Sequence, residues 1–271
     1  METISLLGYK VSRSGLTADV LTALGWLGSR DTARYVACAN PHSLVVASRD
    51  SHFRTALQSA DLLLPDGIGI VHSTKLLGVP PMTRVAGYDF FLRFTAEAAR
   101  LKGVRYYFLG ATPAALRLIR QRLAREFPSI IVCGSYAPPF TDTFSAEENE
   151  KIVAAINRAE PDVLWVGMTA PKQEKWIIDH RGSLQVSCIG AIGAVFDFYS
   201  GIARRSPVFW QRLGLEWLHR LCREPTRLWQ RSFISAPLFV LMVVREFVRS
   251  RLHPEGIGHK RKPLRISKTR L

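Results

Sequence analysis

The stretch ARYVACAN-PHSLVVASRDSHFRTALQSA-DLLLP-DGIG, residues 33–69, decides the fold class of this chain. Residues 33–40 form an apolar run typical of a buried strand, and proline at the next position prevents the ladder from continuing. Residues 41–60 read as a helix, with Pro41 tolerated in its first turn. Residues 61–65 form a second buried strand. Two such strands joined by a helix indicate a βαβ unit with parallel strands.

The same alternation continues through residue 203 and extends the parallel sheet. We expect strands at 3–11, 33–40, 61–65, 104–110, 129–136 and 162–168, and a strand running into a glycine turn at 185–198. We expect helices at 16–30, 41–60, 88–103, 112–128, 145–161 and 170–182. Thr112 with Pro113, and Ser145 with Glu148, are typical helix starts. The predicted fold class is therefore α/β, a Rossmann-like and mostly parallel sheet with helices on both faces.

A helical C-terminal appendage begins near Arg204. Residues 204–252 are aromatic and arginine-rich, and we expect two or three helices interrupted at Pro225 and Pro237. Residues 253–271 form a basic tail that we expect to be disordered. The predicted organisation is a catalytic core at 1–203, a membrane-associating appendage at 204–252 and the tail.

Positive charge is concentrated in that last quarter. Residues 204–271 hold 16 Lys or Arg against 4 Asp or Glu, whereas residues 1–203 hold 21 against 18. Such a segment favours phosphate-bearing partners, namely nucleic acid, an anionic membrane surface or a phosphorylated substrate.

Composition narrows the class of protein further. An apolar fraction of 47% with 22% charged residues is that of a globular chain. We expect neither an export signal nor a spanning helix, because no basic leader and no apolar run of about 18 residues occurs. The four cysteines make no paired C-x-x-C spacing, and we expect buried, reduced thiols of a cytosolic protein.

Four turns follow predicted strands and point to one site. They lie at 38–41, 65–69, 166–173 and 190–193. Ligands of open parallel sheets bind beyond the carboxyl ends of the strands, so these turns should meet along one edge. Asp66 is either a helix N-cap or the acid or base of an active site. Asn40 is either a turn residue before proline or a substrate ligand.

Two basic features of the appendage suggest binding surfaces. Arg220, Arg223 and Arg227 share one helical face, and their guanidinium forks suit a diphosphate, although a solvated face or membrane contact is an alternative. The apolar run at 237–244 is too short to span a bilayer, but its arginine neighbours suit a headgroup layer. An oligomer contact or packing on the core is the alternative for this run.

No signature of a bound cofactor or metal occurs in the sequence, and we expect neither. The G-x-G at 67–69 lacks the rest of a dinucleotide fingerprint, and no Walker A sequence is present. His42, His72 and His180 make no metal-ligand spacing, and no D-x-D occurs where a metal-dependent sugar transferase places one.

Seven blocks in order resemble the WecG/TagA/CpsF family of bacterial glycosyltransferases, over roughly residues 3–231. These blocks are CANPHSLVVA, ADLLLPDGIGIV, RVAGYDFF, YYFLGAT, VGMTAPKQEKW, GAIGAVFDFYSG and RRSPVFWQRLGLEWLHRLCREPTR. The resemblance implies an inverting, metal-independent enzyme, peripheral on the inner face of the cytoplasmic membrane. Its members move a sugar from a UDP-sugar to an undecaprenyl-diphosphate-linked saccharide in teichoic acid, enterobacterial common antigen, capsule or exopolysaccharide synthesis.

The resemblance also implies roles for individual residues. The aspartate of its PDG block, the proposed general base, corresponds to Asp66. Around the sugar and acceptor it implies Cys38, Asn40, Arg84, Gln173 and Asp197. For the UDP diphosphate it implies Arg220 and Arg227, with Arg223 nearby.

Two departures from the family pattern leave the identity of the donor sugar undetermined. Cys38 stands where the family has threonine, so a weak thiol donor replaces a hydroxyl. Thr169 stands where many members have glycine. The donor sugar is thus N-acetylmannosamine-like, a hexose or a uronic acid. Outside this reaction, the alternatives are a basic nucleic-acid-binding protein, disfavoured because no nucleic-acid motif occurs, and a catalytically silent membrane scaffold.

Overall fold

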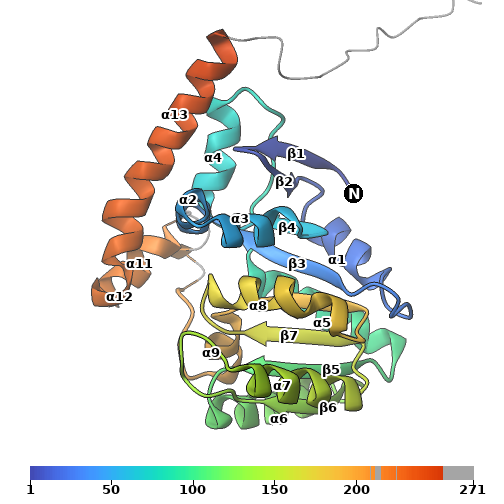
Figure 1. The fold of residues 1–271 in the computed structure, drawn as a ribbon. Helices are drawn as coiled ribbons and strands as arrows, with labels where there is room; N and C mark the ends of the chain where they lie inside the picture. The colour runs from blue at the N-terminus through green and yellow to red at the C-terminus, as the bar shows by residue number, and fades with distance from the viewer. Residues whose placement is uncertain (208, 211–214, 224, 253–271) are drawn as a thin grey trace, which may run out of the picture.

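A single parallel sheet organises the chain in the computed structural model (Figure 1). The structure describes residues 1–207, 209–210, 215–223 and 225–252, with the side chains of Arg220 and Arg227 also excluded. The expected tail at 253–271 lies outside these residues. Six strands pair in parallel, in the order β4 (Leu62–Pro65), β3 (Arg34–Ala39), β8 (Cys188–Ala191), β7 (Val163–Gly167), β5 (Arg105–Gly110) and β6 (Ile131–Tyr136). The predicted α/β class is confirmed.

Helices cover both faces of the sheet (Figure 1). One face carries α2 (Pro41–Arg49), α3 (Ser51–Gln58), α7 (Ala146–Arg158) and α8 (Lys172–His180), followed by the short 3₁₀ turn η1 (Arg181–Ser183). The other carries α1 (Leu16–Leu24), α5 (Gly87–Leu101), α6 (Pro113–Glu126) and α9 (Val195–Ser200). Strand residues alternate between the two cores, so Leu164 belongs to the first and Trp165 to the second.

Helix starts follow the residues expected from the sequence. Thr112 accepts a hydrogen bond from the backbone N–H of Ala115, with Pro113 as the first residue of α6. Ser145 accepts one from the N–H of Glu148 at the start of α7. Both contacts satisfy backbone donors that a helix leaves without an internal partner.

Two expected elements are divided in the structure. Residues 3–11, predicted as one strand, form a hairpin of β1 (Thr3–Leu6) and β2 (Tyr9–Ser12), because Leu7 and Gly8 take positive φ. Residues 41–60, predicted as one helix, divide into α2 and α3 at Asp50. The backbone of Asp50 is extended there, and its carboxylate accepts from the N–H of Phe53, which starts a new helix.

The C-terminal part is helical, as predicted, but Pro237 does not interrupt it. Its elements are α11 (Glu216–Arg223), α12 (Pro225–Trp229), the π-helical segment η2 (Gln230–Ser235) and α13 (Ala236–Leu252). The residue before Pro225 lies outside the described residues, so an interruption at Pro225 stays a prediction. Pro237 lies in the first turn of α13, directly after the wider π-helical turns, where the missing proline N–H is tolerated.

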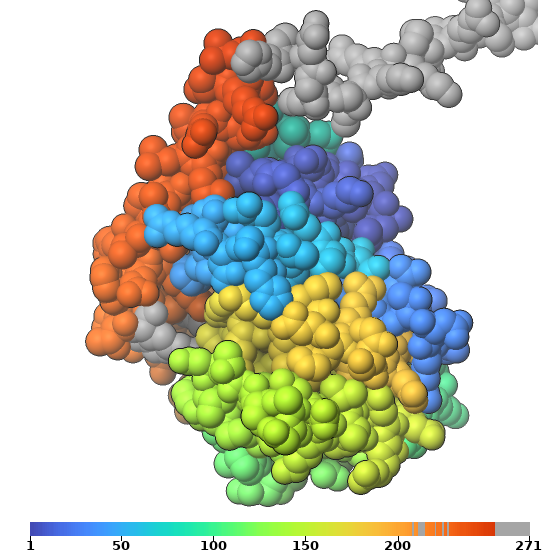
Figure 2. Space-filling view, viewed as in Figure 1, coloured from blue at the N-terminus to red at the C-terminus, as the bar shows by residue number. Residues whose placement is uncertain are grey.

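Helix α13 packs along the core beside α2 and α4 (Ile68–Leu76), as Figures 1 and 2 show. Phe239 and Val243 are buried and join the hydrophobic core of the sheet face that carries α2. Among the described residues no helix is long and apolar enough to cross a membrane. The appendage therefore shares part of its core with the α/β unit.

The cysteines are free, but one prediction about them is wrong. Cys188 is buried, and Cys38 and Cys133 are partly buried, whereas Cys222 is exposed. Its apolar neighbours in α11 led us to expect burial, but Cys222 lies on an exposed part of that helix.

Candidate active site

The carboxyl ends of four adjacent strands meet at one edge of the sheet. Strands β4, β3, β8 and β7 are neighbours in that order and run in parallel. The turns that follow them are the four turns singled out in the sequence. The prediction that these turns share one edge is therefore confirmed, and this edge is where ligands of such sheets bind.

Asp66 follows β4 directly and is not a helix cap. The N-cap of α4 is Gly67, and no side chain caps that helix. The backbone N–H of Asp66 donates to the carbonyl of Ala39 at 2.8 Å, which fixes the residue against the end of β3. Its side chain is partly exposed. The cap alternative for Asp66 is thus removed, and a carboxylate stands at the sheet edge.

The two glycines after Asp66 serve different purposes. Gly67 has φ of 107°, a conformation that favours glycine. A Cβ at Gly69 would lie 2.7 Å from Cγ of Pro41. The space at Gly69 is therefore filled by the start of α2.

Asn40 caps α2 through its side-chain oxygen. The Oδ1 atom accepts from the N–H of Ser43 at 2.9 Å, and the Ser43 hydroxyl accepts from the N–H of Asn40 at 2.8 Å. This capping box confirms a local structural role for Asn40. The cap bonds do not use the amide NH2 group, and the substrate-ligand reading stays a prediction.

Cys38 lies at the end of β3, close to the start of α5. A Cβ at Gly87 would be 3.2 Å from its sulfur, so glycine is needed for this approach. Burial raises the pKa of the Cys38 thiol well above its ordinary value, and the negative charges of Asp66 and Glu174 raise it further. The thiol therefore stays protonated and can only act as a neutral, weak donor.

Arg84 lies beside the same edge but is bound to the appendage. The N–H of its neighbour Val85 donates to the carbonyl of Pro65 at 2.9 Å, which holds this loop against the end of β4. The Arg84 guanidinium pairs with the carboxylate of Glu216 in α11 at 3.0 Å. Arg205 also approaches Glu216, at 3.6 Å, and pairs with Asp89 of α5. These ion pairs bring α11 next to the site.

Gln173 and Glu174 are buried in the first turn of α8. They are 4% and 3% exposed, and Nε2 of Gln173 donates to Oε1 of Glu174 at 2.8 Å. Burial raises the pKa of the Glu174 carboxyl to about 7. Sequence reasoning did not single out Glu174. Its position three residues before the buried Ile177, on the apolar face of α8, was the signal that could have identified it.

The remaining predicted residues are less fully described. Asp197 lies in α9, which follows β8 at the same edge, and its side chain is partly exposed. Arg223 is exposed at the end of α11. Arg220 and Arg227 belong to α11 and α12, but their side chains lie outside the described residues. Within the described part of the chain, no three His, Cys, Asp or Glu side chains gather as a metal site.

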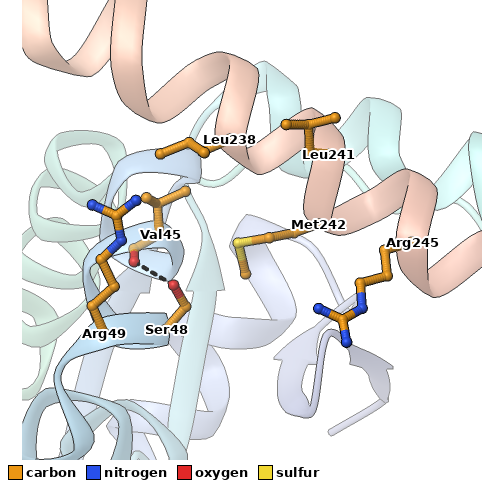
Figure 3. Close-up of a pocket in the computed structure, with 7 residues that line it drawn as sticks. All are labelled: Val45, Ser48, Arg49, Leu238, Leu241, Met242 and Arg245. Carbon is orange, nitrogen blue, oxygen red and sulfur yellow. Dashed lines mark hydrogen bonds between the residues drawn. The ribbon is translucent and has the colours of Figure 1, made fainter.

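A shallow cavity of about 180 Å³ lies between α2 and α13 (Figure 3). Val45 from α2 and Leu238, Leu241 and Met242 from α13 supply apolar walls. Arg49 and Arg245, one from each helix, flank these walls, and both arginines are exposed (Figure 3). The cavity combines apolar surface with positive charge.

A protein-family model described as "Glycosyl transferase WecG/TagA/CpsF family" matches residues 4–253 of the chain. This match covers the sheet, its helices and the whole described appendage. It favours the glycosyltransferase hypothesis over the nucleic-acid-binding and scaffold alternatives.

Similar proteins carry one common name, N-acetylglucosaminyldiphosphoundecaprenol N-acetyl-beta-D-mannosaminyltransferase. The relative from Bacillus spizizenii is 33% identical over 78% of this chain and 79% of its own length. The relative from Bacillus subtilis is 31% identical over the same shares. One from Staphylococcus aureus strain MW2 is 24% identical over 78% of this chain and 80% of its own length.

Proposed function

The chain belongs to the WecG/TagA/CpsF family of glycosyl transferases, and from that premise we propose that it transfers N-acetylmannosamine from a UDP-sugar to an undecaprenyl-diphosphate-linked saccharide. The observation that carries the proposal is the activity shared by its named relatives, which match over 78% of the chain. A hexose or a uronic acid donor is the alternative within the same reaction. The enzyme class itself, glycosyltransferase, follows from the family.

Asp66 is the general base of this reaction in our proposal. Its carboxylate takes the proton from the attacking hydroxyl of the acceptor, whose oxygen then bonds to the anomeric carbon of the donor. UDP departs from the opposite side, so the configuration at that carbon is inverted. The position of Asp66 at the shared strand edge, directly before the Gly67 N-cap of α4, supports this assignment.

Arginines of the appendage stabilise the departing diphosphate. Charge builds up on UDP as the bond to the sugar breaks, and guanidinium groups placed beside it lower the barrier without a metal ion. Arg220 and Arg227 are the proposed ligands, with Arg223 nearby. The ion pair of Arg84 with Glu216 supports this role, because it holds α11 beside the strand edge that carries Asp66.

The appendage also contacts an anionic membrane surface, where the lipid-linked acceptor resides. Exposed apolar side chains support this part of the proposal, since Phe233, Leu241 and Val240 are 68%, 62% and 56% exposed. Arg49 and Arg245 flank the adjacent cavity and complement phosphate headgroups. A second copy of this chain is the other candidate occupant of the same apolar surface.

Replacing Asp66 by Asn tests the base assignment. The loss of a general base lowers kcat by about 10²- to 10⁴-fold, and the melting temperature should stay within a few degrees of wild type. Asp179→Asn is a matched control, since Asp179 is a half-exposed carboxylate on α8 that pairs with His52. Transfer of labelled sugar to a synthetic prenyl-diphosphate-linked N-acetylglucosamine gives the rates. Equal rates for Asp66→Asn and wild type would falsify the assignment.

A further inference from the structure

Glu174 is a carboxyl group that the fold buries without a cation. It is 3% exposed, and within the described residues it makes no ion pair with Lys, Arg or His. Its one side-chain partner is Gln173, at 2.8 Å. Burying an ionisable group with so little compensation costs stability, and an apolar side chain of similar size would avoid that cost. A reason other than stability is therefore needed for a carboxyl group at this position.

The Gln173–Glu174 pair leaves two buried acceptors without a partner. Within the described structure, Oε1 of Gln173 and Oε2 of Glu174 receive no hydrogen bond. Buried polar atoms are nearly always satisfied in folded proteins, so unsatisfied ones mark places where a ligand or an ordered water belongs. Because Glu174 binds the NH2 group of Gln173, the carboxamide is oriented with its oxygen available as an acceptor.

The pair lies under the strand edge that carries the proposed base. A Cβ at Gly193, in the turn after β8, would be 3.3 Å from Oε1 of Gln173. The charge of Glu174 acts on Cys38 and on Tyr35, both in β3, and the charge of Asp66 acts on Cys38 as well. Gln173 thus lies beside the turn that follows β8, and Glu174 lies near β3.

We infer that Glu174 is a positioning residue for sugar transfer: it fixes the Gln173 carboxamide so that its carbonyl oxygen accepts a hydrogen bond from a hydroxyl or amide N–H of the bound sugar. This inference rests on the proposed function and extends it to a residue that the family resemblance did not single out. Glu174 itself need not touch the sugar. Its effect on the reaction passes through Gln173.

Two substitutions at Glu174 separate orientation from simple packing. Glu174→Met fills similar space but cannot accept from Gln173, so kcat/KM should fall by up to about 100-fold, the cost of a misplaced substrate contact. Glu174→Gln keeps an acceptor oxygen for Gln173 and should retain activity within about fivefold of wild type. Loss of a buried charge leaves the melting temperature of Glu174→Met unchanged or higher. A role in stability alone predicts a lower melting temperature with normal kinetic constants.

A double-mutant cycle with Gln173→Ala tests whether Glu174 acts through Gln173. If it does, Gln173→Ala and the double variant Gln173→Ala with Glu174→Met have equal kcat/KM. Losses that multiply in the double variant contradict the inference, as does wild-type activity of Glu174→Met. An active Gln173→Ala contradicts it too, whether or not Glu174→Met folds.

The same assay separates failure of this inference from failure of the proposed function. It uses the full chain, UDP-N-acetylmannosamine and prenyl-diphosphate-linked N-acetylglucosamine. If wild type transfers sugar and Asp66→Asn does not, but Glu174→Met is normal, only the inference fails. If wild type transfers nothing from any UDP-sugar, the proposed function fails with it.

Discussion

Proteins usually bury apolar side chains and expose charged ones, and two regions of this molecule depart from that pattern in opposite directions. They are the strand edge and the outer surface of α13. At the edge, a carboxyl group and its amide partner are buried, with Glu174 only 3% exposed. On α13, large apolar side chains face outward, with Leu241 62% exposed. Each arrangement costs free energy in an isolated, water-soluble chain. Violations of this kind concentrate where a protein meets its ligands, which supports the proposed sugar site at the edge and the proposed lipid contact of α13.

The two regions are nevertheless connected in the fold. Helix α2 begins at the edge, where Asn40 caps it, and ends at Arg49 beside α13. With a rise of about 1.5 Å per residue, its nine residues span about 13 Å. A lipid-linked acceptor held at the α13 surface would therefore lie one short helix away from Asp66. Substitutions confined to one region should show which region governs sugar transfer and which governs attachment to the membrane.

The largest expected effect comes from removing the diphosphate contacts. Replacing Arg220 and Arg227 together by Gln should lower kcat/KM for the UDP-sugar by about 10³-fold, because two charged donors to the departing group are lost. Arg117→Gln on helix α6 is a suitable control, since Arg117 is an exposed arginine outside the appendage. Steady-state kinetics with varied donor gives the values. A wild-type kcat/KM in the double variant would contradict diphosphate binding by these arginines and leave membrane contact as the proposed role of the appendage.

The buried carboxyl should show itself in the pH dependence of stability. Glu174 has its pKa raised from 4.5 to about 7, so between these values the folded state binds more protons than the unfolded state, and stability falls as pH rises. From about pH 5 to about pH 8 this change amounts to about 2 to 3 kcal/mol. Glu174→Met lacks it and should gain that much relative to wild type.

Denaturant unfolding of the two proteins at each pH measures this difference. Asp19, whose pKa burial raises to about 6, and His42, whose pKa burial and the charge of Arg231 lower to about 4, contribute to both proteins and cancel in the comparison. A constant stability difference across the range would contradict the burial of a titrating group at position 174.

The exposed apolar surface should govern attachment to lipid. Leu241→Ser combined with Val244→Ser should weaken binding to vesicles containing phosphatidylglycerol by about tenfold, because partial burial of two apolar side chains is lost. Leu118→Ser on α6 serves as the control, since Leu118 is 40% exposed on another part of the molecule. Co-sedimentation with vesicles reports the binding. Unchanged vesicle binding, together with a loss of dimers in sedimentation velocity, would assign this surface to a second copy of the chain.

The smallest effect is expected at Cys38. Cys38→Thr introduces a stronger hydrogen-bond donor of similar size, and kcat/KM for UDP-N-acetylmannosamine should rise by at most about threefold. The tight approach to Gly87, where a Cβ would be 3.2 Å from the sulfur, limits how well the new side chain fits. A change in the preferred UDP-sugar would show instead that this position selects the donor.

Sequence reasoning predicted the sheet and its functional edge because both depend on simple patterns. Apolar runs alternating with helices indicated parallel strands, and parallel strands align the turns that follow them, which placed Asp66, Asn40 and Gln173 together. Resemblance to a family was still needed to choose a reaction. The sequence pattern alone could not distinguish a cap from a base at Asp66.

The expectations that failed concern packing between separate segments, which local sequence patterns do not encode. Pro237 was read as a break, but the preceding π-helical turns accommodate it. Glu174 was not singled out from the sequence, because its burial depends on how α8 lies against the sheet. Each required knowledge of contacts between segments far apart in the chain.

The central claim is transfer of a sugar from UDP to a lipid-linked saccharide, and a donor scan tests it most directly. The full-length protein is incubated with prenyl-diphosphate-linked N-acetylglucosamine in phosphatidylglycerol vesicles and, separately, with UDP-N-acetylmannosamine, UDP-N-acetylglucosamine, UDP-glucose and UDP-glucuronic acid. Mass spectrometry follows the acceptor. The account predicts addition of one N-acetylhexosamine residue from UDP-N-acetylmannosamine, which is lost in Asp66→Asn. An acceptor that gains no sugar from any of these donors would contradict it.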